Sequence, residues 1–213
     1  MPDGPFDEHH KRFDAWYDKH RAAYLSELQA VRKALPPHGT GLEVGVGTGR
    51  FAGPLGIAKG IDPSEKMVAA AVRRGVDAIV GRGEALPFPD DGFDHVAIIV
   101  TICFADDPVR VIEEASRVLK PGGRLVVGIV DKESFLGKIY SGRESVFYRN
   151  ARFFSVREIS GMMQAGGLTG IGFYQTIFSD PDSMTAVDEV KKGSGTGGFV
   201  VVYGNKPLRG GKK

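Results

Sequence analysis

The sequence predicts a doubly wound α/β fold, in which helices cover both faces of a mostly parallel sheet. Short apolar runs alternate with helical patterns along the chain, as in strands joined by crossover helices. The run 95–102, HVAIIVTI, is almost wholly apolar, as expected for a central parallel strand buried on both faces. The last two runs, 171–178 and 199–204, have no helix between them, which predicts an antiparallel pair at one sheet edge.

The other elements follow from spacing, capping residues and chain breakers. An amino-terminal helical arm is predicted by apolar residues at helical spacing and ends at Pro36 and Pro37. Further strands are expected at 41–44, 58–61, 76–81 and 124–130. Further helices are expected to begin near Arg50, at Pro63, at Pro108 after an Asp106 or Asp107 cap, and at the capping box of Ser155.

Composition narrows the class of protein. Apolar content of 42%, charged content of 25% and a net charge of +2 are typical of a soluble globular protein and do not favour a nucleic-acid partner. The single cysteine, Cys103, excludes an intrachain disulfide and a cysteine metal cluster, and we expect no metal site. The longest apolar run, 96–105, is too short to insert across a membrane. With a polar, acidic start to the chain, these features predict a cytoplasmic location; oligomeric state is not indicated.

The most informative stretch is GLEVGVGTG at 41–49, where Gly45, Gly47 and Gly49 directly follow an apolar run. Glycine permits positive φ and lets a ligand approach the backbone closely. At the carboxyl end of the first strand of such a sheet, this turn forms the floor of a nucleotide-type pocket. The dinucleotide fingerprint needs glycine at position 50, which is Arg50 here. An NAD(P)-dependent oxidoreductase is therefore the alternative rather than the first hypothesis.

Two acids follow the next two strands. Asp62 lies at the end of the second strand, near the spacing expected for a ribose-binding acid, and its two oxygens match two ribose hydroxyls. The alternative is that Asp62 only caps the following helix. Glu84 follows the third strand and could accept a hydrogen bond from an adenine amino group, with Ala85 and Leu86 against the ring. The alternative there is a surface turn.

Four motifs in order, EVGVGTG, GIDPSEKM, GEALPFPDDGFD and LKPGG, resemble those of the class I S-adenosylmethionine-dependent methyltransferases. The resemblance covers roughly residues 40–130 and is strongest to the ubiquinone- and menaquinone-biosynthesis branch. It implies a Rossmann-like seven-stranded sheet with an antiparallel last strand. It also implies transfer of a methyl group from S-adenosylmethionine to a small-molecule acceptor, leaving S-adenosylhomocysteine. On this basis we expect one domain with a helical cap over 1–38, a cofactor-binding core over 39–133 and an acceptor-side cover with the final strand pair over 134–213.

The resemblance also implies roles for single residues. It places the three glycines of the turn against the methionine part of the cofactor, with Glu43 orienting the turn. It gives Asp62 the ribose hydroxyls, Pro63 and Met67 the sides of the adenosine, and Glu84–Ala85 the adenine.

Two further groups of cofactor contacts are implied. Thr101 and Ile102, after the fourth strand, would face the sulfonium and the acceptor. An aromatic residue of the amino-terminal helix, Trp16 or Tyr17, would close over the cofactor, the alternative for both being packing inside the helical arm.

No catalytic residue is identified, because methyl transfer needs mainly alignment of nucleophile, methyl carbon and sulfur, which contributes on the order of 7–11 kcal/mol. A general base is needed only if the acceptor arrives protonated, and His20, Asp106 and Asp131 are candidates, with capping or surface roles as the alternative. Thr101 to Phe104 contain no Asn-Pro-Pro-Tyr-like sequence, which argues against DNA and glutamine amino-methylating enzymes. A non-catalytic module that binds the cofactor stays open, and Cys103 is expected to pack at a strand end.

The segment 134–154 is rich in aromatic and basic residues. In the family that it resembles, this region builds the acceptor pocket. One interpretation is an aromatic cavity with a cation for an anionic acceptor; the other is a simple cover over the sheet edge. The residues concerned are Tyr140, Phe147, Tyr148, Arg149 and Phe153.

Overall fold

The protein is built around one β-sheet. The computed structural model describes residues 5–143, 145–149 and 151–209. The strand order of the sheet is β3-β2-β1-β4-β5-β8-β6-β7. Strands β1 to β5 pair in parallel, and β8 is inserted antiparallel between β5 and β6. The strands are β1 Gly41–Val44, β2 Lys59–Asp62, β3 Asp77–Val80, β4 Phe93–Ile99, β5 Leu119–Val130, β6 Thr169–Thr176, β7 Lys191–Lys192 and β8 Phe199–Asn205.

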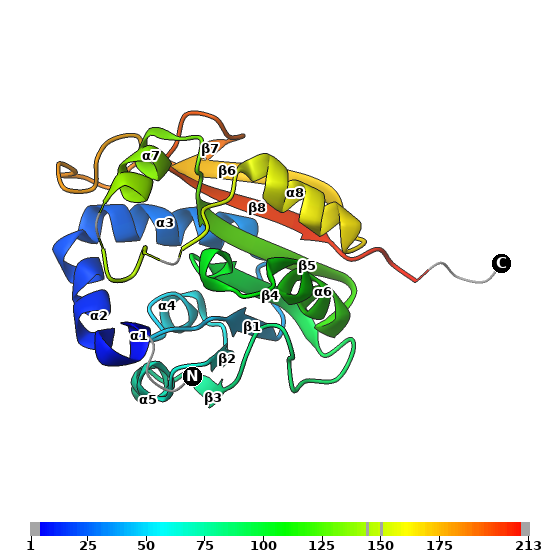
Figure 1. Ribbon diagram of the computed structural model, residues 1–213. Coiled ribbons are helices and arrows are strands. Elements are labelled where there is room, and N and C mark those ends of the chain that lie inside the picture. Colours follow the sequence, from blue (N-terminus) through cyan, green and yellow to red (C-terminus); the bar gives the residue numbers. More distant parts are fainter. Residues whose placement is uncertain (1–4, 144, 150, 210–213) are drawn as a thin grey trace.

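Helices lie on both sides of this sheet (Figure 1), so the predicted doubly wound α/β fold is confirmed. They are α1 Pro5–Glu8, α2 His10–Lys19, α3 Arg21–Ala34, α4 Ala52–Leu55, α5 Glu65–Arg73, α6 Pro108–Val118, α7 Phe135–Gly142 and α8 Val156–Ala165, with a 3₁₀ turn, η1, over Ile102–Phe104. The sheet has one strand more than the seven expected. The extra strand, β7, pairs only two lysines with β6, and two residues are too few for an alternating apolar pattern.

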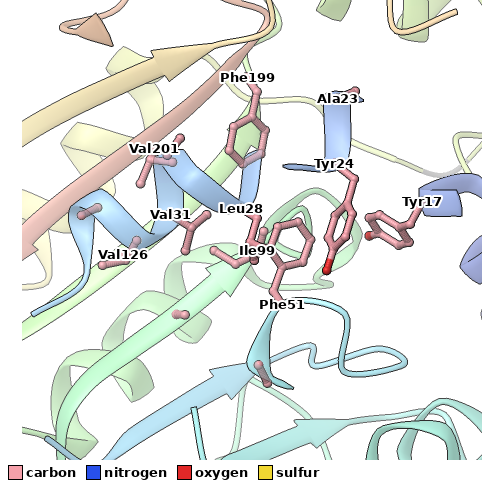
Figure 2. Close-up of a cluster of buried hydrophobic side chains, with 14 of the residues drawn as sticks. Tyr17, Ala23, Tyr24, Leu28, Val31, Phe51, Ile99, Val126, Phe199 and Val201 are labelled. Atoms are coloured by element: carbon pink, nitrogen blue, oxygen red, sulfur yellow. The ribbon is translucent and has the colours of Figure 1, made fainter. Parts of the chain in front are cut away.

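The sheet divides the buried side chains into two clusters. Along β5, Val126 faces the cluster under α3, whereas Leu125 and Val127 face the cluster under α6 and α8. Figure 2 shows Leu28 and Val31 of α3 packed toward strand residues of the first cluster. This alternation explains why β4 and β5 read as unbroken apolar runs: each face has its own covering helices.

The amino-terminal arm is not one helix, as expected, but three. The break between α2 and α3 falls at His20, whose φ of −108° and ψ of 49° are not helical. Both ring nitrogens of His20 are held, Nδ1 by the Trp16 carbonyl at 3.0 Å and Nε2 by an Asp182 oxygen at 2.9 Å. These bonds stabilise the bend, and the bend brings α1 and α2 over the carboxyl ends of the strands.

The capping residues in the sequence predicted the starts of α6 and α8 correctly. Asp107 caps α6 by accepting from the Arg110 N–H at 3.0 Å, with Pro108 in the first turn. Ser155 and Glu158 form the predicted capping box of α8. The helix expected near Arg50 is only four residues long, because Gly56 follows it in the left-handed conformation with φ of 72°.

Candidate active site

The chain between β1 and α4 forms the glycine turn, residues 45–49. Gly45, Gly47 and Gly49 all have positive φ, of 71°, 52° and 80°. A Cβ on Gly45 would lie 2.1 Å from Thr101 Cγ2, and one on Gly49 would lie 3.1 Å from Ala71 Cα. A Cβ on Gly47 would meet nothing within 4 Å. Gly45 and Gly49 are therefore required by packing, whereas Gly47 borders empty space.

That space is the first cavity, of about 240 Å³, at the carboxyl ends of β1, β2 and β4. Nine residues predicted from sequence line it: Tyr17, Glu43, Gly45, Gly47, Asp62, Pro63, Met67, Glu84 and Thr101.

Four predicted residues do not line the first cavity. Gly49 packs on α5, and Ile102 is buried in the cluster under α6. Ala85 follows Glu84 in the turn, and Trp16 faces a second cavity described below.

Asp62 ends β2 and is buried, with 8% of its surface exposed. Its Oδ2 accepts from the Gly47 N–H and its Oδ1 from the Ser64 N–H, each at 2.9 Å. Helix α5 is capped by Ser64, whose hydroxyl accepts from the Met67 N–H at 3.2 Å. Asp62 is therefore not the cap residue of α5, and it joins the glycine turn to the start of that helix. Burial raises its pKa, although both hydrogen bonds oppose the shift.

Glu43 lies under the glycine turn with 2% of its surface exposed. Its Oε2 accepts no hydrogen bond from any residue that the structure describes. Burial raises its pKa well above the usual range. A buried carboxyl oxygen without a partner is costly. Glu43 is among the residues that line the first cavity, although this oxygen is itself closed off from solvent.

Glu84 also lines the first cavity, and its carboxylate is already hydrogen-bonded. Its Oε1 accepts from the Asp106 N–H at 3.1 Å, and its Oε2 lies 3.4 Å from Arg82 Nε. Arg82 and Gly83 also line the cavity. Sequence reasoning passed over both, although they follow β3 directly, where a parallel sheet places its ligand contacts.

The roof of the first cavity comes from α1 and α2. Phe6, Asp7, Phe13 and Tyr17 line it. Asp7 accepts from the Ser64 hydroxyl at 2.6 Å, and the Phe6 and Phe104 rings lie 4.7 Å apart, edge to face. Only Tyr17 was predicted from the sequence, because no spacing pattern shows which distant turn an amino-terminal helix will cover.

Arg50 joins the roof to the glycine turn. Its guanidinium donates to both carboxylate oxygens of Asp14, at 2.9 and 2.8 Å, and to both of Asp18, at 2.8 and 2.7 Å. Arg50 and Asp14 are largely buried, with side-chain exposures of 16% and 22%. Such bidentate pairs are the strongest ion pairs in proteins. Arg50 stands where the dinucleotide fingerprint needs a glycine, and its ion pairs hold α2 in place.

We expect Arg50→Ala to loosen α2 without unfolding the sheet. Hydrogen exchange of the α2 amides should become faster on the order of tenfold, because two bidentate pairs are lost. The control is Lys59→Ala. It removes an exposed ion pair with Asp77 at the start of β2, away from the glycine turn. Unchanged α2 exchange in Arg50→Ala, or an equal change in the control, would contradict this role.

A second cavity, of about 560 Å³, adjoins the first and shares Phe13, Tyr17 and Val100 with it. Val100 has φ of 50°, which is a strained conformation for a β-branched residue. Four predicted residues of the segment 134–154 line this cavity: Tyr140, Phe147, Tyr148 and Phe153. Arg149, the expected cation, does not line it.

The three candidate bases lie in different places. His20 lines the second cavity, and both of its ring nitrogens already have hydrogen-bond partners, the Trp16 carbonyl and Asp182. Asp106 lies at the rim of the first cavity, exposed and paired with Arg82. Asp131 is buried and lines neither cavity. Cys103 is buried as expected, and burial raises its pKa to about 12.

The second cavity contains an acid that sequence reasoning missed. Glu27 of α3 lines it with 5% of its surface exposed, and burial raises its pKa from 4.5 to about 8. A signal was present: Glu27 is three residues after Tyr24 and four before Val31, on the apolar stripe of the helix.

The shifted pKa of Glu27 predicts a pH-dependent stability difference. Between pH 4.5 and 8 the unfolded chain loses the Glu27 proton while the folded protein keeps it, so folding stability falls as pH rises. Glu27→Gln removes this cost. We expect the variant to be more stable than the parent by about 4 kcal/mol at pH 8 and about equally stable at pH 4. Urea unfolding at the two pH values measures this, and a gain that is the same at both would contradict it.

Comparisons with known proteins agree with this geometry. The methyltransferase domain family matches residues 42–127. Uncharacterized protein MJ1123 of Methanocaldococcus jannaschii is 44% identical over 203 residues, which cover 94% of this chain and 98% of that protein. The crystal structure of a Thermotoga maritima protein, described as an S-adenosylmethionine-dependent methyltransferase and possible histamine N-methyltransferase, is 49% identical. Its TM-score is 0.91, and the match covers 94% of this chain and 98% of that one. The chain belongs to the S-adenosylmethionine-dependent methyltransferase family.

The methyltransferase also matches relatives in the branch that its motifs resemble. A demethylmenaquinone methyltransferase of Bacillus licheniformis is 31% identical over 140 residues, which cover 58% of this chain and 60% of that enzyme. Family membership supports the use of S-adenosylmethionine and does not favour the nicotinamide alternative.

No helix within the described residues is both long and apolar enough to cross a membrane. Nor do His, Cys, Asp and Glu side chains gather in threes or more to hold a metal ion within residues 5–143, 145–149 and 151–209.

Proposed function

We propose that this methyltransferase binds S-adenosylmethionine in the first cavity and moves its methyl group directly to a small molecule held in the second. One observation carries the proposal: the two cavities meet at Val100, Phe13 and Tyr17, beside the glycine turn. A donor and an acceptor bound on either side of this boundary can face each other. Direct in-line transfer then requires only that the acceptor atom, methyl carbon and sulfur align.

The residues of the first cavity fit the cofactor. Asp62 has a buried carboxylate whose two oxygens can each accept a further bond from a ribose hydroxyl. Glu43 lines the same cavity beneath the glycine turn, where the methionine part is proposed to lie. Gly47 leaves room where a side chain would stand. Bound there, the sulfonium supplies an activated methyl group and a good leaving group.

The remaining residues would exclude water and shape the pocket. Phe6, Phe13 and Tyr17 form an aromatic roof over the first cavity. Of the predicted pair, Tyr17 is the better candidate to cover the cofactor, because Trp16 lines only the second cavity. Ile102 is more suited to support the strand end from the core.

A small acceptor is proposed from the size and walls of the second cavity. About 560 Å³ is within the range of small-molecule sites, roughly 300–1,000 Å³, and several Phe, Tyr and Trp side chains line it. The Thermotoga maritima relative described as a possible histamine N-methyltransferase supports a small acceptor. We extend the proposal to one domain with cap 1–38, core 39–133 and cover 134–213, acting in the cytoplasm.

The proposal is tested by transfer of label from methyl-labelled S-adenosylmethionine to a metabolite extract. We expect a low-molecular-weight labelled product that depends on the protein and disappears in Asp62→Ala. Tight binding of S-adenosylhomocysteine with no labelled product from any extract would favour a non-catalytic module. Label that appears only in nucleic acid or protein would contradict the small-molecule acceptor.

A further inference from the structure

The second cavity has a buried acid, Glu27, that has no partner among the described residues. Glu27 lies on the buried face of α3, with 5% of its side chain and backbone surface exposed. Its carboxylate lines the cavity. Within residues 5–143, 145–149 and 151–209, it makes no hydrogen bond within 3.5 Å and no ion pair within 4.0 Å. A buried carboxylate in that position is unfavourable unless a ligand satisfies it.

Aromatic rings surround the same space. Tyr140 and Tyr148 stack with centroids 5.1 Å apart, and Phe153 packs on Tyr148 at 5.7 Å. Tyr17 and Trp16 line the cavity from α2. The faces of such rings carry negative charge density and attract cations.

The cations at the cavity rim are largely committed elsewhere. Asp182 accepts from Lys19 at 3.1 Å, from His20 at 2.9 Å and from Arg143 at 3.1 Å. Arg12 also lines the cavity and is exposed to solvent. The interior therefore offers the Glu27 carboxyl group and several ring faces, and no cation contributes to the pKa of Glu27, which burial alone raises.

We propose that the methyl acceptor carries a protonated nitrogen and that Glu27 binds it inside the aromatic wall of the second cavity. The assignment rests on the proposed function for the place of the acceptor, and it adds the acceptor's chemical class and the residue that recognises it. An ammonium group satisfies the carboxylate and the ring faces together. One interpretation of the segment 134–154 was a cation, Arg149, for an anionic acceptor. Such an acceptor would meet the Glu27 carboxylate instead.

Glu27 also explains how the cavity selects between acceptors of similar shape. An uncharged molecule of the same size would leave the carboxylate without a partner, and a site built for a charged group rejects analogues that lack it. Ionisation of Glu27 and binding of the cation stabilise each other. Amine affinity is therefore expected to rise with pH as the empty site loses its proton.

The test compares two probes that differ in one group, 2-phenylethylamine and 2-phenylethanol, by calorimetry on the full chain saturated with S-adenosylhomocysteine. At pH 8 we expect the amine to bind at least tenfold more tightly than the alcohol. Glu27→Gln should weaken amine binding on the order of 10- to 100-fold and leave alcohol binding unchanged. Glu27→Asp, which keeps the charge, should retain part of the preference. Glu113→Gln, an exposed glutamate on α6, is the control and should behave as the parent.

The pH dependence gives a second measurement. The parent should bind the amine more tightly at pH 8 than at pH 6, and Glu27→Gln should bind it equally at both. The titrating and charged groups that share the cavity with Glu27 are Tyr17, Tyr140, Tyr148, His20, Asp182, Arg12, Lys19 and Arg143. They are identical in parent and variant, so a pH effect that survives in Glu27→Gln would overturn the assignment.

Titration of S-adenosylhomocysteine into parent and Glu27→Gln separates this inference from the proposed function. Equal cofactor affinity in the two proteins, together with no amine preference in the parent, overturns the role of Glu27 and leaves the cofactor site standing. Loss of cofactor affinity in Glu27→Gln also overturns it, because Glu27 would then serve the donor. Absence of cofactor binding by the parent itself would contradict the proposed function instead.

Discussion

Replacing Asp62 by alanine is expected to weaken binding of S-adenosylhomocysteine by about 100-fold or more, while the protein stays folded. Asp62 is proposed to hold two ribose hydroxyls, and a hydrogen bond to a charged group contributes roughly 1.5–3 kcal/mol. The same carboxylate also accepts from the Gly47 and Ser64 N–H groups, so its loss loosens the turn under the ligand. Calorimetry measures the affinity, and circular dichroism checks the fold.

Two variants make the Asp62 result specific. Asp62→Asn keeps the shape but replaces one acceptor oxygen by a donor, so it should also bind weakly. Asp77→Ala, on the exposed start of β3, should bind as the parent does. Affinity within threefold of the parent in Asp62→Ala would refute the ribose assignment.

The second large effect separates packing from ligand contact among the glycines. Gly45→Ala is expected to destabilise the protein by about 3 kcal/mol or more, because its Cβ would overlap Thr101 and its φ is positive. Gly47→Ala should cost only about 1–2 kcal/mol of backbone strain, but should lose cofactor affinity at least tenfold because a methyl group enters the first cavity.

Gly56→Ala is the matched control for Gly47→Ala. Gly56 has φ of 72°, also with open space around a Cβ, but it ends α4 and does not line the first cavity. It should lose similar stability and keep full cofactor affinity. Equal affinities in the Gly47 and Gly56 variants would show that Gly47 does not face the ligand.

Features set by neighbours in sequence were predictable. The turn at Gly45–Gly49, the Ser155 capping box and the apolar strands β4 and β5 depend on residues a few positions apart. Asp62 could be placed because the end of a strand in a parallel sheet has a defined location. Only part of the lining of the first cavity follows from these local rules.

Features that depend on distant contacts were not predictable in the same way. Arg50 was noticed only for the glycine it replaces, because its pairs with Asp14 and Asp18 require the bend at His20. Phe6 packs on Phe104, a residue far from it in the sequence. Glu27 had a local signal, an acid on an apolar stripe, but only the arrangement of α7 and the following segment shows which cavity it lines.

A crystal structure of the protein with S-adenosylhomocysteine tests the central claim most directly. We predict the ribose hydroxyls within hydrogen-bond distance of Asp62, the methionine part over Gly47 beside Glu43, and the sulfur facing Val100 and the second cavity. A cofactor bound elsewhere, or one whose sulfur points away from the second cavity, would contradict the account.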